Sequence, residues 1–223
     1  MVLLDGTEPL IHYFVPFSGI IFNGNFISIQ FQHVHCWTAL LEKISHSKMK
    51  RALKIAFTGP ESTGKSTLSS WLSAEMKIPL MEEYARVYLA EKKEYFQEDL
   101  DLIAREQVKL WSKESHFIAD TEMTVMKVWS EVKYSCCSDL IQKYFDSQFF
   151  DVYFLCVPDI PWEEDPMREN PNDRNEIFEL YHNLLETQKV NYKIISGELE
   201  ERKQQILNYL QDHYKASPQI RPV

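Results

Sequence analysis

The sequence predicts an α/β fold, a three-layer sandwich in which helices cover both faces of a mainly parallel sheet. Two observations lead to this prediction. From residue 50 onward, short apolar runs alternate with longer segments whose apolar residues recur at helical spacing. A glycine-rich loop also separates the first apolar run from the first helical segment. Such alternation produces parallel strands, and ligands then bind at the carboxyl ends of those strands.

Each predicted element depends on one pattern. Short apolar runs of the length of buried strands occur, in chain order, at residues 52–58, 78–81, 117–119, 151–157 and 192–195. Apolar residues at helical spacing predict helices, in chain order, at residues 64–77, 97–113, 122–132, around 177–185, and at 198–214. In the first helix, for example, Leu68, Leu72 and Met76 fall on one face, as expected of a helix that packs on a sheet.

The glycine-rich loop has the pattern of a phosphate-binding loop. Gly59-Pro60-Glu61-Ser62-Thr63-Gly64-Lys65-Ser66 fits G-x-x-x-x-G-K-[ST], and it lies between a predicted strand and a predicted helix. Backbone N–H groups of such a loop, together with the positive end of the helix dipole, bind phosphate groups. Lys65 is expected to reach the β- and γ-phosphates, and Ser66 to ligate Mg²⁺. A glycine-rich turn before an ordinary helix is the alternative, and the strand-loop-helix context disfavours it.

The overall composition excludes several classes of function. The chain has 223 residues and a net charge of −9, which argues against a nucleic-acid partner because such partners need a basic face. No apolar run reaches the length of about 18 residues that a membrane span needs. The four cysteines lack metal-ligand spacing, which favours a reduced, cytoplasmic setting. The sequence says nothing about the oligomeric state.

Residues 1–49 differ from the rest and are predicted to be an N-terminal extension. Residues 20–31 have the alternation and turn of a β-hairpin. His33, His35 and Cys36 have no second ligand cluster, so packed or exposed side chains are expected there rather than a metal site. Met49 is followed by basic residues and the first strand, and our hypothesis is that it is the physiological start. We expect the phosphate-binding domain at residues 50–215 and a disordered tail at residues 216–223.

Acidic residues follow two of the predicted strands. Asp120 ends the third strand, where an acid would hold Mg²⁺, although Asp120 could instead be the N-cap of the next helix. Glu83 and Arg86 follow the second strand, where a carboxylate could bind a sugar hydroxyl or take its proton and an arginine could bind a phosphate. A solvated helix start is the alternative for Glu83. Of the two adjacent carboxylates Glu82 and Glu83, Glu82 is the one expected to be an ordinary surface side chain.

Two further features are candidates for contacts with a substrate. Gln107 lies on the apolar stripe of its helix and needs a partner there, either substrate or backbone. Residues 159–174 hold three prolines and no periodicity, which predicts a loop directly after a strand. Small P-loop kinases carry a lid at this position, and Arg168 and Arg174 are its candidate arginines for the transferring phosphoryl group. A plain surface loop is the alternative.

Together these elements resemble a known family. They are Gly59–Leu68, Glu83–Arg86, Asp120-Thr121, Val128–Glu131, and Asp159–Trp162 with Arg168–Asn170. In this order the set is similar to the ribosylnicotinamide kinase domain of NadR-like proteins, of the AAA_28 type of P-loop ATPase. The resemblance covers residues 50–214. It implies a P-loop NTPase fold of the nucleoside- and nucleotide-kinase kind.

The resemblance implies transfer of the γ-phosphate of ATP to the 5′-hydroxyl of nicotinamide riboside. Gly59–Thr67 would hold ATP, and Ser66 with Asp120 would hold Mg²⁺. Glu83 and Arg86 would face the riboside, with Glu83 preferred over Asp120 as the base because an Asp bound to Mg²⁺ is a poor proton acceptor. The candidates to stack on the cationic nicotinamide ring are Tyr84, Trp129 and Tyr134. Trp129 also fits the core stripe of its helix.

The chain departs from the family in two respects. Fifty residues are too few for the nucleotidyltransferase domain of bifunctional relatives, and the HxGH-type motif is missing, so adenylyl transfer and repression are not expected. Glu122 stands where Asp is expected in many relatives, which could alter how the acceptor is bound. Two other interpretations stay open: a kinase for another nucleoside or small metabolite, and a non-catalytic ATP-binding regulatory module.

Overall fold

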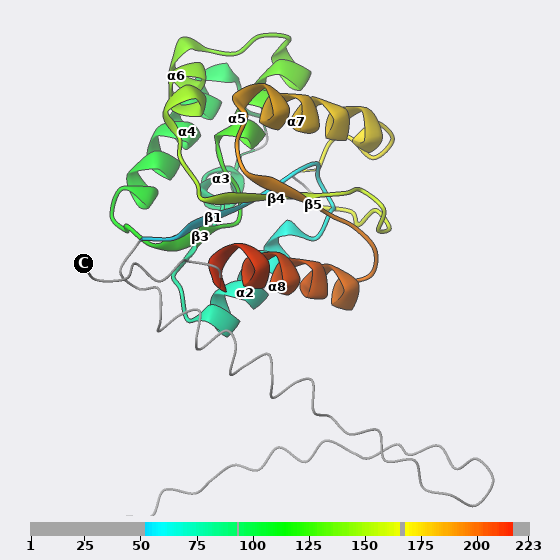
Figure 1. The fold of residues 1–223 in the computed structure, drawn as a ribbon. Coiled ribbons are helices and arrows are strands. Elements are labelled where there is room, and N and C mark those ends of the chain that lie inside the picture. Colours follow the sequence, from blue (N-terminus) through cyan, green and yellow to red (C-terminus); the bar gives the residue numbers. More distant parts are fainter. Residues whose placement is uncertain (1–51, 93, 166–167, 216–223) are drawn as a thin grey trace, which may run out of the picture. The chain divides into compact units, whose positions relative to one another are not determined.

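The computed structural model describes residues 52–215, apart from residues 93, 166 and 167. It contains a five-stranded sheet in the order β2-β3-β1-β4-β5. The strands are β1 (Lys54–Thr58), β2 (Leu80–Met81), β3 (Phe117–Ala119), β4 (Val152–Cys156) and β5 (Tyr192–Ile195). Each neighbouring pair is parallel, so all carboxyl ends lie at one edge of the sheet. Figure 1 shows this sheet between two groups of helices.

The central strand β1 is enclosed on both faces. Its residue Ile55 lies opposite Ile118 of β3 and Val152 of β4. The side chains of Ile55, Ala56 and Phe57 are fully buried, and so is every residue of β4. Parallel strands covered on both faces have continuous apolar sequences. The apolar runs in the sequence therefore correspond to the middle of the sheet.

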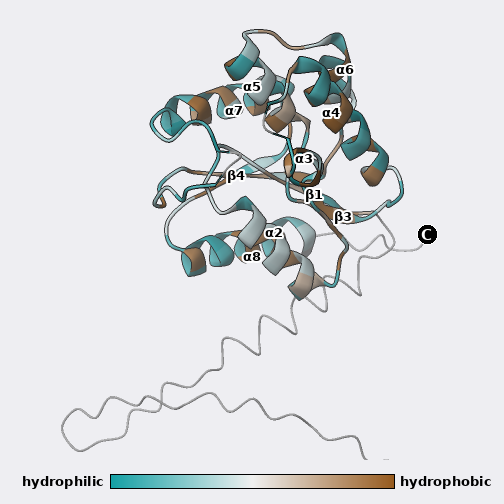
Figure 2. Ribbon diagram, turned by 180° about the vertical axis from the view of Figure 1, so that it is seen from behind, coloured by the Kyte–Doolittle hydropathy of each residue, from teal (hydrophilic) through white to brown (hydrophobic). Residues whose placement is uncertain are grey.

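The helices form the two outer layers. They are α2 (Lys65–Met76), α3 (Tyr84–Leu89), α4 (Gln97–Trp111), α5 (Met123–Tyr134), α6 (Asp139–Ser147), α7 (Arg174–Gln188) and α8 (Leu199–Lys215). Helices α2 and α8 cover one face of the sheet, and α4, α5, α6 and α7 cover the other (Figures 1 and 2). In Figure 2, α4 and α7 alternate between brown and teal along their length, as amphipathic helices do.

The structure confirms the predicted three-layer sandwich with its parallel sheet. The helix start that was the alternative for Glu83 is present, because Glu83 is the residue before α3. The structure also adds helix α6, which the sequence did not predict. This helix has only nine residues, and it buries just Ile141 and Phe145, so its periodic signal is short. Ser138 caps it, with its hydroxyl accepting a hydrogen bond from the Ile141 N–H at 3.2 Å. The second strand is shorter than predicted and comprises Leu80 and Met81 alone.

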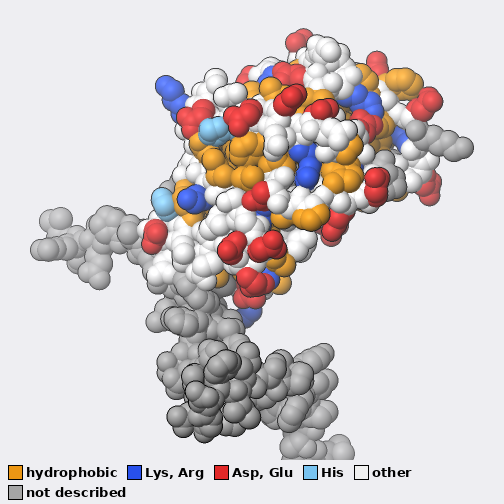
Figure 3. Space-filling model, turned by 90° about the vertical axis from the view of Figure 1, so that its right-hand side faces the viewer, with side chains coloured by type: hydrophobic (Ala, Val, Ile, Leu, Met, Phe, Trp, Pro, Cys, Tyr) orange, Lys and Arg blue, Asp and Glu red, His pale blue; other side chains and the backbone are white. Residues whose placement is uncertain are grey.

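The predicted N-terminal extension (residues 1–49) and the predicted tail (residues 216–223) lie outside the described residues. The hairpin, the histidines and the start at Met49 therefore stay predictions. Within residues 52–215, leaving out the three positions named above, no helix is long and apolar enough to cross a membrane. On the face seen in Figure 3, acidic side chains are widely spread with basic ones among them, in keeping with the net negative charge.

The carboxylate that caps α5 is Glu122 and not Asp120. Glu122 accepts hydrogen bonds from the Thr124 N–H at 2.6 Å and from the Thr58 hydroxyl at 2.6 Å. Gln148 donates a further bond to it at 2.8 Å. Capping by Asp120, one of the two roles predicted for that residue, is therefore wrong. The side chain of Glu122 is fully buried, and it does not line the cavity described below.

Glu122 makes the stability of the fold pH dependent. Burial raises the pKa of its carboxyl group above the ordinary value of 4.5, against the opposing effect of its hydrogen bonds. The pKa of Glu122 is higher in the folded than in the unfolded state. Its contribution to the stability of the fold is therefore fully present at pH values below the unfolded-state pKa. That contribution is lost as the pH rises through the folded pKa.

We expect the Glu122→Gln variant, which cannot ionise, to lose less stability than the wild type as the pH rises from the unfolded-state pKa of Glu122 through its folded-state pKa. Chemical denaturation at a series of pH values measures the difference, with Glu114→Gln on the exposed surface as the matched control. Parallel pH curves for wild type and Glu122→Gln would contradict this expectation.

Candidate functional site

A cavity of about 250 Å³ lies where four strands end. The segments after β1, β2, β3 and β4 all contribute to its walls, as expected for the carboxyl edge of a parallel sheet. Helices α5 and α7 close its side. The lining residues used below are Gly59–Thr67, Glu83, Arg86, Asp120, Trp129, Lys133, Arg168, Glu169, Arg174 and Tyr181.

The backbone of the loop after β1 requires its two glycines. Gly59 has a φ of +123°, and a Cβ there would lie 2.7 Å from the carbonyl oxygen of Cys156. Gly64, the residue before α2, has a φ of +79°. Ser62 also adopts the left-handed region, with a φ of 53°, which costs a non-glycine residue about 1 kcal/mol or more. Strain of this kind is typical of functional loops.

The amino end of α2 opens into the cavity. Its first turn contains no acidic residue, so nothing on the helix competes with an anion for its N–H groups. The Lys65 ammonium donates to the carbonyl oxygens of Gly59 at 2.9 Å and Pro60 at 2.6 Å. Burial lowers the pKa of Lys65, and Glu83 is the foremost of the acidic groups that oppose this shift. A cation held against the loop in this way is placed to meet phosphate oxygens.

Asp120 and Ser66 offer the oxygen atoms that Mg²⁺ prefers. Asp120 is 7% exposed and accepts a hydrogen bond from the Ser69 hydroxyl at 3.2 Å. Ser66 is exposed on the first turn of α2 and lines the same cavity. The described residues contain no group of three or more acidic, histidine or cysteine side chains that could hold a metal by themselves. This donor set fits Mg²⁺, which usually takes one or two protein oxygens together with substrate phosphates and water.

Glu83 and Arg86 form an ion pair at the cavity wall. The Arg86 Nε lies 3.1 Å from Glu83 Oε2, and Arg86 Nη1 lies 3.1 Å from Asp165 Oδ2. Burial raises the pKa of Glu83, and the positive charges of Lys65 and Arg86 partly oppose that shift. A carboxylate with a raised pKa is a better proton acceptor than an exposed one.

The structure places Gln107 behind this wall and not in the cavity lining. Its Oε1 accepts from the Tyr84 N–H at 2.8 Å, and its Nε2 donates to the Glu82 carbonyl at 3.1 Å. Both ends of the amide are therefore paired with the backbone on either side of Glu83. Of the two partners predicted for Gln107, the backbone is the one that the structure shows, and Gln107 holds Glu83 in position.

The segment after β4 is docked onto the phosphate-binding loop. Glu61 Oε2 accepts hydrogen bonds from the backbone N–H groups of Glu169 and Asn170, at 2.9 and 3.1 Å. The Ser62 hydroxyl accepts one from the Glu163 N–H at 2.9 Å. Side chains of the loop thus bind backbone N–H groups of the predicted lid, and Arg168, Glu169 and Asn170 of this segment line the cavity.

The two predicted lid arginines both line the cavity. Arg168 Nη1 donates to the Glu163 carbonyl at 2.6 Å and lies 3.4 Å from the Ser62 hydroxyl. Arg174, the first residue of α7, donates to the carbonyls of Ser62 and Ile160 at 3.1 Å each. Two guanidinium groups therefore lie beside the loop where phosphates are expected.

One of the three predicted aromatic contacts lines the cavity. Trp129 does so, and its indole N–H donates to the Tyr95 hydroxyl at 3.0 Å. Tyr84 instead stacks on Tyr88, with ring centroids 6.2 Å apart. The Tyr134 hydroxyl donates to the Tyr95 carbonyl at 2.7 Å, and its ring packs against the core. Trp129 thus presents the aromatic surface of the cavity among these three residues.

Sequence reasoning missed several residues of the cavity. Lys133 Nζ lies 2.6 Å from Glu169 Oε1, and this ion pair joins α5 to the lid. Tyr181 of α7 is 4% exposed and lines the cavity, and no hydrogen bond reaches its hydroxyl from the described residues. Both residues looked like ordinary members of amphipathic helices. Their place in the cavity depends on how α5 and α7 pack, which local periodicity does not reveal.

Comparison with known proteins identifies the family of the chain and solved structures that share its fold. A family model described as "AAA domain" (AAA_28) matches residues 54–202. No curated protein matches the chain. Among solved structures, the NadR protein in complex with NAD and AMP-PNP has a TM-score of 0.64 and 19% identity, covering 90% of this chain and 63% of that one.

Two other solved structures are similar. The NadR protein in complex with NR has a TM-score of 0.62 and 18% identity, covering 77% of this chain and 53% of that one. Thymidylate kinase from Ehrlichia chaffeensis has a TM-score of 0.54 and 16% identity, covering 72% of this chain and 100% of that one. The chain thus spans less than two thirds of the length of both NadR chains. At such identities the likeness establishes a shared fold, which is that of P-loop kinases.

The role of Gln107 can be tested without any assay of activity. In Gln107→Leu the Tyr84 N–H and the Glu82 carbonyl lose their partners, so we expect unfolding to become easier by about 1–3 kcal/mol. Hydrogen exchange of the Tyr84 amide should become faster, because its acceptor is gone. Gln204→Leu, on the exposed face of α8, is the matched control. Unchanged protection of Tyr84 in Gln107→Leu would show that Gln107 does not hold this segment.

Proposed function

The chain belongs to the AAA_28 family of AAA domains, and from its cavity and its likeness to the NadR structures we propose that it is an ATP-dependent kinase that phosphorylates nicotinamide riboside to nicotinamide mononucleotide. One observation carries the proposal: the phosphate-binding loop, the Glu83–Arg86 pair and the lid arginines all line one cavity. A module that only senses ATP needs a donor site. It needs neither a carboxylate beside an acceptor nor arginines placed over the loop.

The donor half of the cavity would bind the phosphates of ATP. The N–H groups of the loop and of the first turn of α2 would bind these phosphates. Lys65 can donate to phosphate oxygens in place of the carbonyl oxygens of Gly59 and Pro60. Ser66 and Asp120 would hold Mg²⁺, which neutralises charge on the phosphates when it is bound. Arg168 and Arg174 would stabilise the negative charge of the phosphoryl group during transfer.

The acceptor half would bind the riboside. Glu83 can accept the proton of the 5′-hydroxyl as that oxygen attacks the γ-phosphorus, while the bond from this phosphorus to the bridging oxygen breaks and ADP leaves. Arg86 would keep the carboxylate oriented through its ion pair. Trp129 can present its ring to the cationic nicotinamide, since cations are attracted to aromatic faces. The lid would exclude water, which would otherwise compete with the riboside for the phosphoryl group.

A coupled assay of ADP release tests the proposal. With ATP and Mg²⁺, we expect turnover with nicotinamide riboside that exceeds turnover with a panel of other nucleosides. Lys65→Ala should lower turnover by about 100-fold or more, because it removes the charge that meets the transferring phosphate. Lys113→Ala, on the exposed surface, is the matched control and should be unaffected.

Three outcomes would contradict the proposal. Turnover with another nucleoside but not with nicotinamide riboside would assign the cavity to a different acceptor. No acceptor-dependent turnover at all would support the regulatory module that binds ATP without transferring phosphate. Turnover that survives Lys65→Ala would remove the phosphate-binding loop from the mechanism.

The role of Glu83 predicts a particular pH dependence. A general base works in its deprotonated form, so the rate should rise with pH through the pKa of Glu83. Because burial raises that pKa, the rise should occur above the ordinary value of 4.5. Glu83→Gln should lower kcat by about 100-fold or more and abolish the acidic limb of the profile.

Glu82→Gln is the matched control, because Glu82 is the adjacent carboxylate and is exposed. It should leave both the rate and the profile close to those of the wild type. A Glu83→Gln variant that keeps the acidic limb would assign the proton acceptor to another group.

A further inference from the structure

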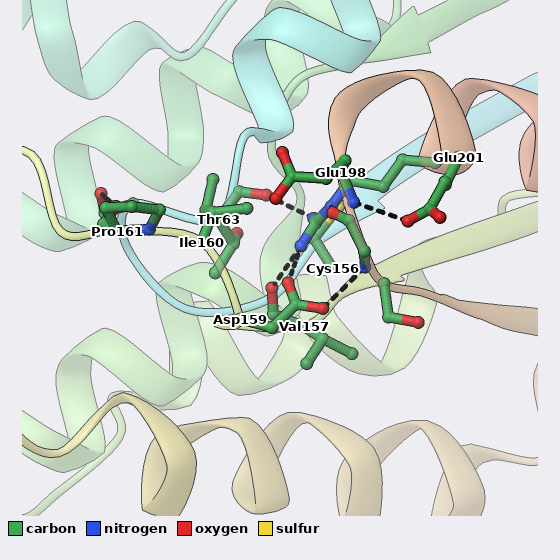
Figure 4. A network of polar contacts seen from close by, with 12 residues as sticks. Thr63, Cys156, Val157, Asp159, Ile160, Pro161, Glu198 and Glu201 are labelled. Carbon is green, nitrogen blue, oxygen red and sulfur yellow. Dashed lines mark hydrogen bonds and ion pairs between the residues drawn. The ribbon is translucent and has the colours of Figure 1, made fainter.

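Helix α8 buries an arginine beneath the phosphate-binding loop. Arg202 is 2% exposed and is the largest of the fully buried side chains in the described part of the chain. It is not among the residues that line the cavity. Figure 4 shows its surroundings, with Thr63, Val157, Asp159 and Glu198 grouped around one network of polar contacts.

Four hydrogen bonds join Arg202 to three separate segments. Its Nη1 donates to the Thr63 carbonyl of the loop at 2.9 Å. Its Nη2 donates to the Val157 carbonyl at 3.0 Å and also to Asp159 Oδ1, where the lid begins. Its Nε donates to the Gly197 carbonyl, before α8, at 2.6 Å. One planar group therefore connects the loop, the root of the lid and the turn after β5.

The charge of Arg202 is balanced locally. An arginine stays protonated in proteins, so its burial is costly unless a carboxylate and full hydrogen bonding compensate. Asp159 supplies the carboxylate, and its other oxygen accepts from the Gly197 N–H at 2.7 Å. Buried ion pairs add little net stability compared with apolar residues of the same size. The buried Arg202–Asp159 pair is therefore better explained by the positions in which it holds the segments that Arg202 joins.

Arg202 sets the direction of a peptide group in the loop. In a planar trans peptide the carbonyl and the following N–H point in opposite directions. Because Arg202 binds the Thr63 carbonyl from outside the cavity, the Gly64 N–H faces away from Arg202. Gly64 and Lys65 line the cavity, so this N–H is turned toward the place of the phosphates.

We infer that Arg202 is a positioning residue for the donor nucleotide, and this inference rests on the proposed function. It keeps the loop N–H groups aimed at the phosphates and ties that orientation to the root of the lid. Lysine cannot replace it, because a single ammonium group cannot reach three separate carbonyls and a carboxylate in the geometry of a planar fork.

The test is binding of a fluorescent ATP analogue in the absence of any acceptor, together with separate KM values for ATP and acceptor. We expect Arg202→Lys and Arg202→Met to raise the Kd of the analogue and the KM for ATP by about tenfold or more. The KM for the acceptor should stay close to that of the wild type. Arg105→Lys and Arg105→Met, at an exposed position of α4, are the matched controls.

Asp159→Asn provides a second variant if the Arg202 variants fail to fold. It keeps the size of the side chain, removes its charge and leaves the Thr63 bond in place. We expect a smaller rise in the Kd of the analogue than for Arg202→Met. Thermal unfolding of each variant defines a temperature at which it is folded, and binding is measured there.

The inference is overturned if folded Arg202 or Asp159 variants bind the analogue as tightly as the wild type. A lower unfolding temperature with an unchanged Kd would mean a purely structural role. Failure of the proposed function looks different: the wild type itself would then show no acceptor-dependent turnover. The binding comparison still decides the role of Arg202 in that case.

Discussion

The rest of the site depends on the backbone conformation of the loop at residues 59–67. The φ of Gly59 favours glycine, and a Cβ at this position would clash with the Cys156 carbonyl oxygen. Ser62 is held in the left-handed region. Contacts from outside the loop maintain this backbone. Arg202 binds it from the side of α8, and the lid binds it through Arg174. A loop restrained in this way has little conformational freedom to lose when it binds phosphate.

The order of the strands explains why distant segments of the chain line one cavity. β1 lies at the centre of the sheet and is followed by the phosphate-binding loop, while β3 and β2 on one side are followed by Asp120 and Glu83. β4 on the other side carries the lid. Because all strands are parallel, their carboxyl ends meet at one edge. Residues that are far apart in the sequence therefore surround the same small volume.

Local patterns predicted much of the fold and part of the site. The loop motif, the alternation of strands and helices, and the acids at strand ends all depend on short-range spacing. Other features depend on packing. Gln107 looked like a polar residue in search of a partner, and only the fold shows that backbone on both sides of Glu83 supplies it. Arg202 looked like one charged residue among many in a polar helix. Its partners Thr63, Val157 and Asp159 are far from it in the sequence, so local spacing does not reveal them.

A crystal structure with AMP-PNP, Mg²⁺ and nicotinamide riboside most directly tests our claim that ATP and the riboside meet in this one cavity. We predict that the phosphates lie against residues 59–67, with the 5′-oxygen of the riboside between Glu83 and the γ-phosphorus. The nicotinamide ring should lie against Trp129. A nucleotide bound away from this loop, or a riboside bound outside the cavity at saturating concentration, would contradict the claim.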